Sequence, residues 1–467
     1  MIYSLVPQQV AGLGEREQWM LQKLLETYNA HNSANHVKDK YYEGKISLAD
    51  VNLGIALPEG MRGLEIGCAW GAKTVDVLAA RSMFDGYVSA SGNEAEELER
   101  VVVGNNLIYE YMKACRDELK YGCTFATLSA DKENGCKIRF HSPQSAAALW
   151  DGEAGRIMCG FAIIDTVPEN DAQTVWTPSV INLYTQDAVW VMTRDENGWS
   201  AEEYRHKMGR PLMEPLVWNA TSTKPFGRSR IKEPVRRLID GYVRTIANAT
   251  IGLEFATAPQ KYLLGVSDEQ YDALINQKFK QYVGNILAAT KDPETGEKPT
   301  FGQLSQGSIT PHVEMVRVLA TQFSAATGLS VTDTGVVNDA NPTSSDAILA
   351  QSQTLINMAE QLNTANGDAL RDIALMALAI MNGTDISGLT DEQKAVVAHF
   401  KNPAMPSVAV TADAAIKISS ARPEFAETDT FLEMIGFDQA DIRRIKAQEE
   451  RARGMALVDE IANENIE

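Results

Sequence analysis

The sequence predicts a mainly helical protein of the α+β class, with an antiparallel sheet between helical segments. Between residues 121 and 200, short strand-like runs are separated by turns rich in Asp, Asn and Gly, such as 131–135 and 195–198. On either side of this stretch, apolar residues recur every three or four positions, which is the spacing of an amphipathic helix.

The helices can be bounded by this spacing and by their end signals. Helices are expected at residues 15–29, 72–82 and 105–121. Pro234 suits the first turn of a helix that ends near Ala258, and Thr310-Pro311 opens another that runs to about Thr327. Further helices are expected at 268–289, after the capping signal Thr343-x-x-Asp346, and in the C-terminal part with breaks at 382–383, 401–406 and 422–423.

The strands are expected to pair as consecutive hairpins. Residues 124–129 and 136–141 form the first hairpin, and 156–165, 179–184 and 188–193 continue in the same style. Hairpins joined by short turns favour an antiparallel sheet over the alternating strand–helix units of a parallel one.

Charge limits the kind of DNA contact that the chain can make. Its 467 residues include 62 acidic and 43 basic side chains, for a net charge of −19. Tight DNA binding needs Lys and Arg to displace counterions, and no run of them occurs here. We therefore expect no sequence-reading grip on DNA, although loose passage of DNA along an acidic wall stays open.

The N-terminal sequence and the apolar runs indicate neither export nor a membrane span. The start, MIYSLVPQQV, lacks a basic region followed by a long apolar one. The longest strongly apolar run, 373–381, is far shorter than the roughly 18 residues that a span needs. A protein made and used in a cytoplasm is expected.

Motifs for catalysis or metal binding are missing from the sequence. It holds no C-x-x-C, H-E-x-x-H, G-x-S-x-G or Walker A pattern. We predict no catalytic residues, no cofactor and no metal site, and we expect the thiols to be buried or free. The cysteines are Cys68, Cys115, Cys123, Cys136 and Cys159.

The one enzyme-like pattern is Glu65-Ile-Gly67-Cys-Ala69-Trp-Gly71. It resembles the glycine-rich loop of S-adenosylmethionine-dependent methyltransferases, with Ala69 in place of the middle glycine. Such a loop must follow a buried strand, and residues 57–63 contain two glycines and a proline, which suits a strand poorly. A turn leading into a helix is the favoured interpretation.

Five segments in order along the chain point to a family. They are Tyr41-Tyr42-Glu43-Gly44 with Met61-Arg62, then residues 225–231 (PFGRSRI), 258–265 (APQKYLLG), 327–329 (TGL) and 341–348 (NPTSSDAI). Together they resemble the portal proteins of tailed double-stranded-DNA bacteriophages, of the siphophage type. Lys261 stands where that family often has Arg, and Leu329-Ser330 where it often has Val-Pro.

The resemblance implies a phage portal fold with wing, stem, clip and crown regions, assembled into a closed ring that usually has twelve subunits. It implies docking of the terminase large subunit, of the head–tail adaptor and of capsid and scaffolding proteins. Double-stranded DNA would pass without sequence specificity, and no membrane is involved. The protein would be assembled in the host cytoplasm and located at the portal vertex of the virion. The expected regions are the wing at 1–225, the stem helix at 226–258, the clip at 259–310, the second stem helix at 311–328, the tunnel loop at 329–341, a long helix returning to the wing at 342–400, and the crown at 401–467.

The resemblance also implies site residues. In the tunnel loop, Gly335 permits a sharp turn, and Val336-Val337 would offer DNA an apolar tip. The stem arginines would face either DNA or a neighbouring subunit's acids; the second role is favoured because phosphate binding would brake sliding. The loop candidates are Leu329, Thr332, Gly335, Val336, Val337 and Asn338; the stem candidates are Arg236, Arg237, Arg244 and Arg317; the clip signature is Pro259, Gln260, Lys261 and Tyr262.

Two alternatives remain open from the sequence. Another ring or shell component of a virion comes second, and a methyltransferase third. Electron microscopy of the purified protein tests them: a ring with a central hole supports the portal, whereas a monomer that binds S-adenosylmethionine would contradict it.

Overall fold

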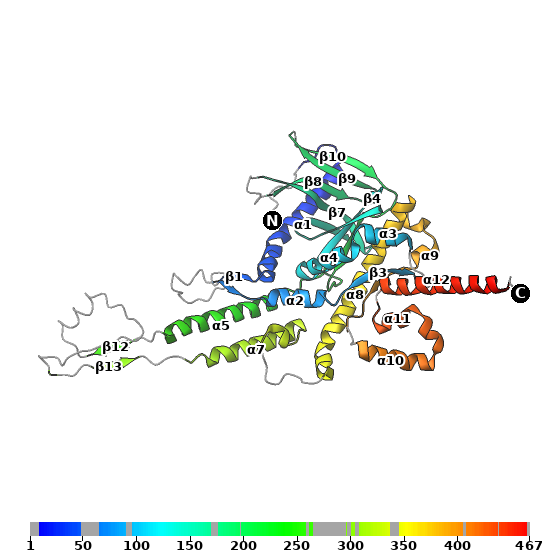
Figure 1. Cartoon of the computed structure of the whole chain (residues 1–467). Helices are drawn as coiled ribbons and strands as arrows, with labels where there is room; N and C mark the ends of the chain where they lie inside the picture. Colours follow the sequence, from blue (N-terminus) through cyan, green and yellow to red (C-terminus); the bar gives the residue numbers. More distant parts are fainter. Residues whose placement is uncertain are drawn as a thin grey trace.

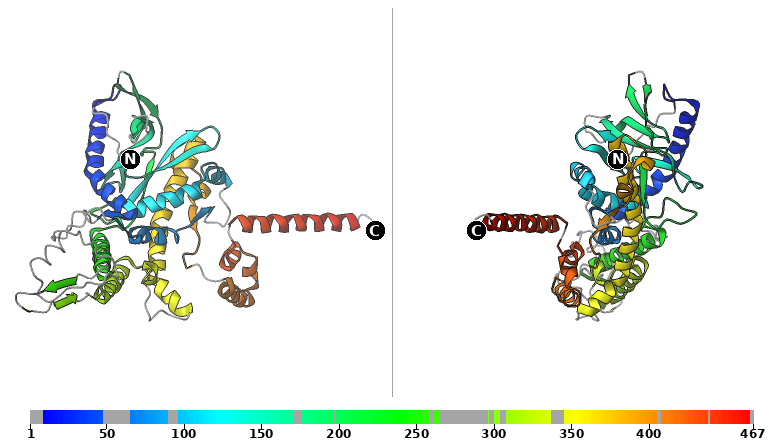
Figure 2. Two further views of the ribbon diagram at one scale, coloured as in Figure 1. Left: turned by 60° about the vertical axis from the view of Figure 1, so that its left-hand side comes forward. Right: turned by 90° about the vertical axis from the view of Figure 1, so that its right-hand side faces the viewer.

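The computed structural model describes residues 9–47, 65–89, 96–169, 176–196, 198–257, 261–264, 296, 300–303, 308–336, 345–404, 408–437 and 439–464. Within these ranges the chain is a mixed α+β protein, as predicted. Two projections leave a body of helices and sheets (Figure 1). One is the helix pair α5 (Glu233–Thr257) and α7 (Thr310–Thr327), with a ribbon of β12 (Lys261–Leu264) and β13 (Thr300–Gln303) at its far end. The other is the last helix, α12 (Gln439–Glu464), which stands clear of the body (Figure 2).

The body contains two larger antiparallel sheets in place of the single one expected. Five strands pair in the order β10-β9-β8-β7-β6, so neighbours in the chain are neighbours in the sheet. The predicted hairpin at 124–141 belongs to a separate three-stranded sheet, because β11 returns along β4. The strands are β4 (Cys123–Asp131), β5 (Gly135–His141), β6 (Ala146–Asp151), β7 (Arg156–Pro168), β8 (Trp176–Tyr184), β9 (Ala188–Asp195), β10 (Gly198–Arg205) and β11 (Met213–Val217).

The first helix, α1 (Glu15–Tyr42), packs on one face of the five-stranded sheet. Its buried residues Leu24 and Tyr28 lie in a core that also contains Phe161 of β7 and Ile181 of β8. The rings of Tyr28 and Phe161 meet edge to face, with centroids 5.7 Å apart. The predicted helix at 15–29 is confirmed, and it continues to Tyr42 because polar contacts described below hold its last turns.

The long helix expected after residue 343 is confirmed as α8 (Ser345–Asn382). Its capping residue Thr343 lies outside the described residues. The buried side of α8, which includes Leu362 and Ile373, packs on the three-stranded sheet and belongs to the same core as α4 (Leu107–Tyr121). The predicted break at 382–383 is confirmed as the end of this helix.

Residues 342–400 are not helical throughout, which corrects the expectation of a single long helix. After α8 the chain forms β14 (Val396–Phe400), which pairs antiparallel with β3 (Phe84–Ser89). A strand pair that joins residues more than 300 positions apart leaves no local pattern to predict it.

The C-terminal helices contact the body through His399 of β14. Its Nδ1 lies 4.0 Å from Asp85 Oδ2, and its Nε2 lies 3.6 Å from Glu433 Oε1. Lys446 of α12 pairs with Asp429 at 2.6 Å. The predicted break at 422–423 is confirmed, since α10 (Val408–Ala421) ends before Pro423 and α11 (Asp429–Ile435) follows.

All five cysteines are buried and free, as expected. Burial raises the pKa of the Cys68 thiol to about 11 and that of Cys136 to about 12. At neutral pH these side chains are therefore neutral and act as small apolar residues of the core.

A buried polar cluster joins α4 to α8. Asn366 Nδ2 donates to Glu118 Oε2 at 2.8 Å and to the Tyr111 hydroxyl at 3.0 Å, which also lies 2.6 Å from Ser82 Oγ. Glu118 is 0% exposed. Its burial raises the pKa of the carboxyl to about 8, against the opposing effect of the Asn366 hydrogen bond. The side chain is consequently protonated at neutral pH.

We expect Glu118→Gln to raise the free energy of unfolding at pH 8 by about 2 kcal/mol or more, with little change at pH 4. The folded pKa of about 8 lies above the ordinary 4.5, so stability is greatest below pH 4.5 and falls as the pH rises through 8. Glutamine removes this loss because it is neutral at every pH. Urea unfolding at the two pH values measures the effect. Glu110→Gln, on a half-exposed part of the same helix, is the control, and equal shifts at both pH values would contradict the assignment.

Candidate functional site

The two projecting helices pack against each other along one apolar side each. On α5 the buried residues Val235, Ile239, Val243 and Ala247 follow a four-residue spacing. On α7 the buried apolar residues are Leu319, Ala320 and Phe323. The helices approach closely at Gly241, where an added Cβ would lie 3.1 Å from Leu319. The helices predicted from Pro234 and Thr310-Pro311 are confirmed at nearly their expected bounds.

The chain leaves α7 through a compact turn formed by residues 328–336. Ser330 donates to Asp333 Oδ2 through both its backbone N–H, at 2.9 Å, and its hydroxyl, at 2.8 Å. Gly335 follows with φ of +78°, the left-handed region that glycine favours, so the chain turns sharply there. Leu329 is buried in the main core, and Val336 is half-buried against it.

Trp70, from the first turn of α2 (Trp70–Ala79), lies where the helix pair and the turn meet. Its ring centroid is 4.5 Å from that of Tyr242 on α5 and 4.7 Å from that of Phe323 on α7. Its Nε1 donates to the carbonyl oxygen of Thr334 at 3.0 Å. One side chain, 4% exposed, therefore contacts both helices and the turn.

Arg230 fixes the same region from the segment that precedes α5. Its side chain is 7% exposed. Nε donates to the carbonyl of Thr74 at 2.6 Å, and Nη2 donates to the carbonyl of Thr327, the last residue of α7, at 2.6 Å. Burial lowers the pKa of the guanidinium to about 10, which still leaves it charged at neutral pH. The negative end of the α7 dipole stabilises that charge.

The segment before α5 is itself held on the C-terminal end of α4. Ser229 Oγ donates to the carbonyl of Lys120 at 2.5 Å and accepts from the N–H of Ile231 at 2.9 Å. The backbone N–H of Arg230 donates to the carbonyl of Leu119 at 2.9 Å. The PFGRSRI sequence therefore forms an ordered strap that precedes α5, and α5 itself starts at Glu233.

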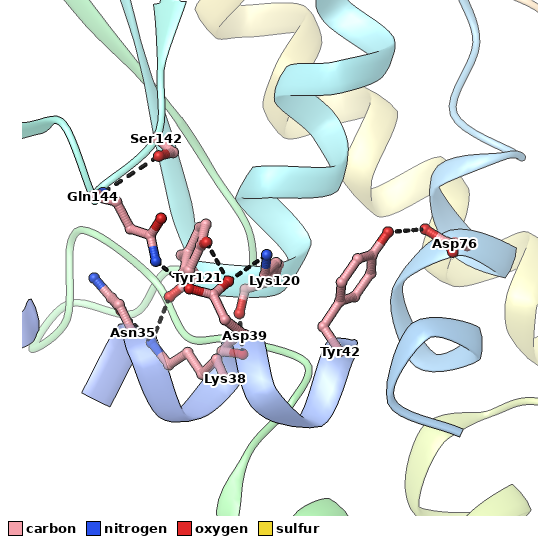
Figure 3. A network of polar contacts seen from close by, with 10 residues as sticks. Asn35, Lys38, Asp39, Tyr42, Asp76, Lys120, Tyr121, Ser142 and Gln144 are labelled. Carbon is pink, nitrogen blue, oxygen red and sulfur yellow. Dashed lines mark hydrogen bonds and ion pairs between the residues drawn. The ribbon is translucent and has the colours of Figure 1, made fainter. Parts of the chain in front are cut away.

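The last turns of α1 form a polar network with α4 and α2 (Figure 3). Asp39 accepts from the Tyr121 hydroxyl at 2.5 Å and also pairs with Lys120 and Gln144. This network explains why α1 extends beyond its apolar stripe.

Both tyrosines of the Tyr41-Tyr42 motif reach other helices. The Tyr41 hydroxyl donates to Asp240 of α5 at 2.7 Å, and the Tyr42 hydroxyl donates to Asp76 of α2 at 2.9 Å. Burial, together with the hydrogen bond to Asp76, raises the pKa of Tyr42 to about 12. The motif thus joins the first helix to the base of the projecting pair.

The methyltransferase-like pattern has a different geometry from a cofactor loop. Its strand, β2 (Glu65–Gly67), pairs antiparallel with β1 (Lys45–Ser47), and every pair of strands among the described residues is antiparallel. A Cβ added at Gly71 would overlap the carbonyl oxygen of Tyr41, whereas one at Gly67 would meet nothing within 4 Å. Gly71 is therefore required by helix packing, and the loop lacks the parallel strands of a dinucleotide-type crevice.

The stem arginines lie on the helix pair in three different settings. Arg237 pairs with Glu233 at 3.3 Å and Arg317 with Glu314 at 3.0 Å, each within its own helix. The Arg236 guanidinium lies 5.9 Å from the centre of the Tyr41 ring. Arg244 is exposed, and it has no ion pair with any residue that the structure describes.

The remaining expected site residues are only partly covered by the structure. Thr332 and Gly335 are exposed on the turn, while Val337 and Asn338 lie outside the described residues. Lys261 and Tyr262 belong to β12, and Pro259 and Gln260 lie outside the described residues, as does the predicted helix at 268–289. The sequence did not single out Trp70 or Arg230, whose partners are remote in the chain.

The described residues contain neither a metal-binding cluster nor a membrane-spanning helix. In the described parts of the chain, no three His, Cys, Asp or Glu side chains gather in a way that would hold a metal ion. The described helices likewise include none with the length and apolar character to cross a membrane.

Comparisons with known proteins place the chain in a family. The solved structures "Virion of native gene transfer agent (GTA) particle" and "Neck of native GTA particle computed with C12 symmetry" are similar at 12% and 11% identity, with TM-scores of 0.44 and 0.46. Each similarity covers 79% of this chain and 89% of that chain. A comparison with curated proteins gave no match. The family model "Phage portal protein, SPP1 Gp6-like" matches residues 15–455, which confirms the resemblance of the five segments. The chain therefore belongs to the SPP1 Gp6-like family of phage portal proteins.

Proposed function

We propose that this chain is the ring subunit of a phage portal vertex, the channel through which DNA is packaged and ejected. The observation that carries the proposal is the helix pair α5–α7. It projects from the body, bears the β12–β13 ribbon at its far end, and returns directly into the turn at 328–336 (Figure 1). In a member of the portal family, this arrangement suits a stem, a clip and a tunnel loop.

The regions follow from that assignment. The wing comprises residues 1–225, with α1, α4 and the two sheets, and the helix α8 returns to it. The clip, 259–310, includes the β12–β13 ribbon and would dock the terminase large subunit and later the head–tail adaptor. The C-terminal helices from 401 onward form the crown, and capsid and scaffolding proteins would contact the ring's outer parts.

DNA would slide through the ring without being gripped. A net charge of −19 per subunit is repeated around the ring, and such a wall repels phosphate. The tunnel loop would then make the contact with DNA. Its candidate residues are Thr332, Gly335 and Val336, which the structure describes, and Val337 and Asn338, which lie outside the described residues. Leu329 is buried, so we leave it out of the contact set.

Arg244 is the stem arginine that we assign to the contact between subunits. Arg237 and Arg317 already have acidic partners in their own helices, and Arg236 lies over Tyr41. Arg244 is exposed on α5, and of these four arginines it is the one with neither an ion pair nor an aromatic contact to a residue that the structure describes. In a heterologous ring, one such pair with a neighbour's carboxylate is repeated at every interface.

Negative-stain electron microscopy of the purified full-length protein tests the proposal. We expect rings with a central hole formed by this chain alone, and Arg244→Glu should shift the population from rings toward monomers because like charges then meet. Arg244→Lys keeps the charge and should keep the rings. A monomer that binds S-adenosylmethionine, or a closed shell, would overturn the proposed function. Intact Arg244→Glu rings that fail to package DNA would instead assign Arg244 to the DNA.

A further inference from the structure

A single side chain from the body links the two projecting helices to the turn that follows them. Trp70 lies between Tyr242 of α5 and Phe323 of α7, with centroid distances of 4.5 and 4.7 Å, and its N–H is directed at the Thr334 carbonyl, 3.0 Å away. It belongs to the Glu65–Gly71 pattern, to which the proposed function gives no role.

The indole is buried, so its N–H has a strong requirement for a partner. If the turn moved away from Trp70, a donor would be left unsatisfied in an apolar setting, which is more costly than the loss of an exposed hydrogen bond. The start of the turn is bonded to α7, because Ser324 Oγ donates to the carbonyl of Leu329 at 2.6 Å. The other hydrogen bonds of residues 330–336, from Ser330 to Asp333 and from Thr334 to Val331, are internal to the turn. They shape this part of the turn but do not fix its place relative to the helices.

The aromatic contacts make that place depend on the helix pair. The indole plane is tilted by 39° to the ring of Tyr242 and by 34° to that of Phe323, so it is held on two sides by residues of different helices. A shift of α5 relative to α7 must therefore change the packing of the indole. The hydrogen bond to Thr334 passes that change to the turn.

We propose that Trp70 is a positioning residue that ties residues 330–336 to the relative position of α5 and α7. This inference rests on the proposed function, in which the same residues are the base of the loop that contacts DNA. Residues 330–336 then take their position from the stem and do not move independently of it. This coupling between the turn and the helix pair is present in the protein without DNA.

Amide hydrogen exchange of the assembled full-length protein tests the tie. In Trp70→Phe an aromatic ring stays in place but the N–H is lost, so peptides covering residues 330–336 should exchange about 5-fold to 10-fold faster, as expected for one buried hydrogen bond. Peptides of α5 and α7 should be unchanged. Tyr242→Leu, which removes the ring that contacts the indole from α5, should also speed exchange at 330–336 by about 2-fold or more. Trp190→Phe makes the same chemical change in the other core and serves as the control.

Two outcomes would overturn the proposal. One is an unchanged exchange rate at 330–336 in Trp70→Phe. The other is a rate that rises equally in α5, α7 and the turn, which would indicate general loosening. DNA packaging by the Trp70→Phe ring tests the proposed function separately. A loosened turn with normal packaging would support the tie and count against the loop as a DNA contact.

Discussion

Replacing Arg230 with methionine is expected to lower the free energy of unfolding by about 3–5 kcal/mol, the largest stability effect that we predict. The change leaves the carbonyl of Thr327, at the end of α7, without its buried donor, and it removes the bond to Thr74. The flexible methionine fills most of the space, so the lost hydrogen bonds and not a cavity dominate the effect. Urea unfolding of the full chain measures it.

The effect should be nearly independent of pH between 5 and 8. The folded pKa of Arg230 is about 10, so the side chain is charged in both the folded and unfolded chain throughout that window. Arg228→Met, two residues away at an exposed position, is the matched control and should change stability by less than about 0.5 kcal/mol. If the two variants were equally stable, Arg230 would not be the anchor that its contacts indicate.

Gly71→Ala is expected to destabilise the fold by about 2–4 kcal/mol. The new methyl group would overlap the carbonyl oxygen of Tyr41, and neither backbone can retreat without disturbing the hydrogen bonds of Tyr41 to Asp240 and of Tyr42 to Asp76. Thermal or urea unfolding measures the loss.

Gly67→Ala separates this explanation from the methyltransferase interpretation. An added Cβ at Gly67 meets nothing within 4 Å, so the substitution should be tolerated. In a cofactor loop, both glycines would allow close approach to the ligand. Replacing either one with alanine would then be expected to weaken cofactor binding and to leave the stability of the protein unchanged. A stable Gly71→Ala variant would therefore contradict the packing role of this glycine.

The parts of the fold that could be predicted are those that local chemistry specifies. The proline at the start of α5, the Thr-Pro pair at the start of α7 and the Asn-Gly pair after α8 each mark a helix end within a few residues. The hairpins of β4–β5 and of β8–β9 follow from short strands and turn residues. By contrast, the pairings of β11 with β4 and of β14 with β3 join distant segments, and nothing in either strand alone specifies its partner.

The site divides in the same way. The sharp turn at Gly335 and the family resemblance follow from single residues and short motifs. Trp70 was visible only as part of an enzyme-like pattern, because its partners lie at positions 242, 323 and 334. Arginine is ordinarily a surface residue, and the burial of Arg230 becomes favourable only once the fold brings the end of α7 to it. The signal available in the sequence was a charged residue, Arg230, inside a motif (residues 225–231) that itself contains no acidic residue.

The position of Trp70 along the stem has a mechanical consequence. Helix α5 has 25 residues and is therefore ~37 Å long at 1.5 Å per residue, with Arg230 holding its near end. Tyr242 lies only ~14 Å from that end by the same rise. A sideways displacement of the far end then reaches the indole reduced to about two fifths, so ~4 Å becomes ~1.5 Å. In a helix that pivots rigidly at this end, the indole would therefore move over a short stroke, with a force roughly two to three times that applied at the far end.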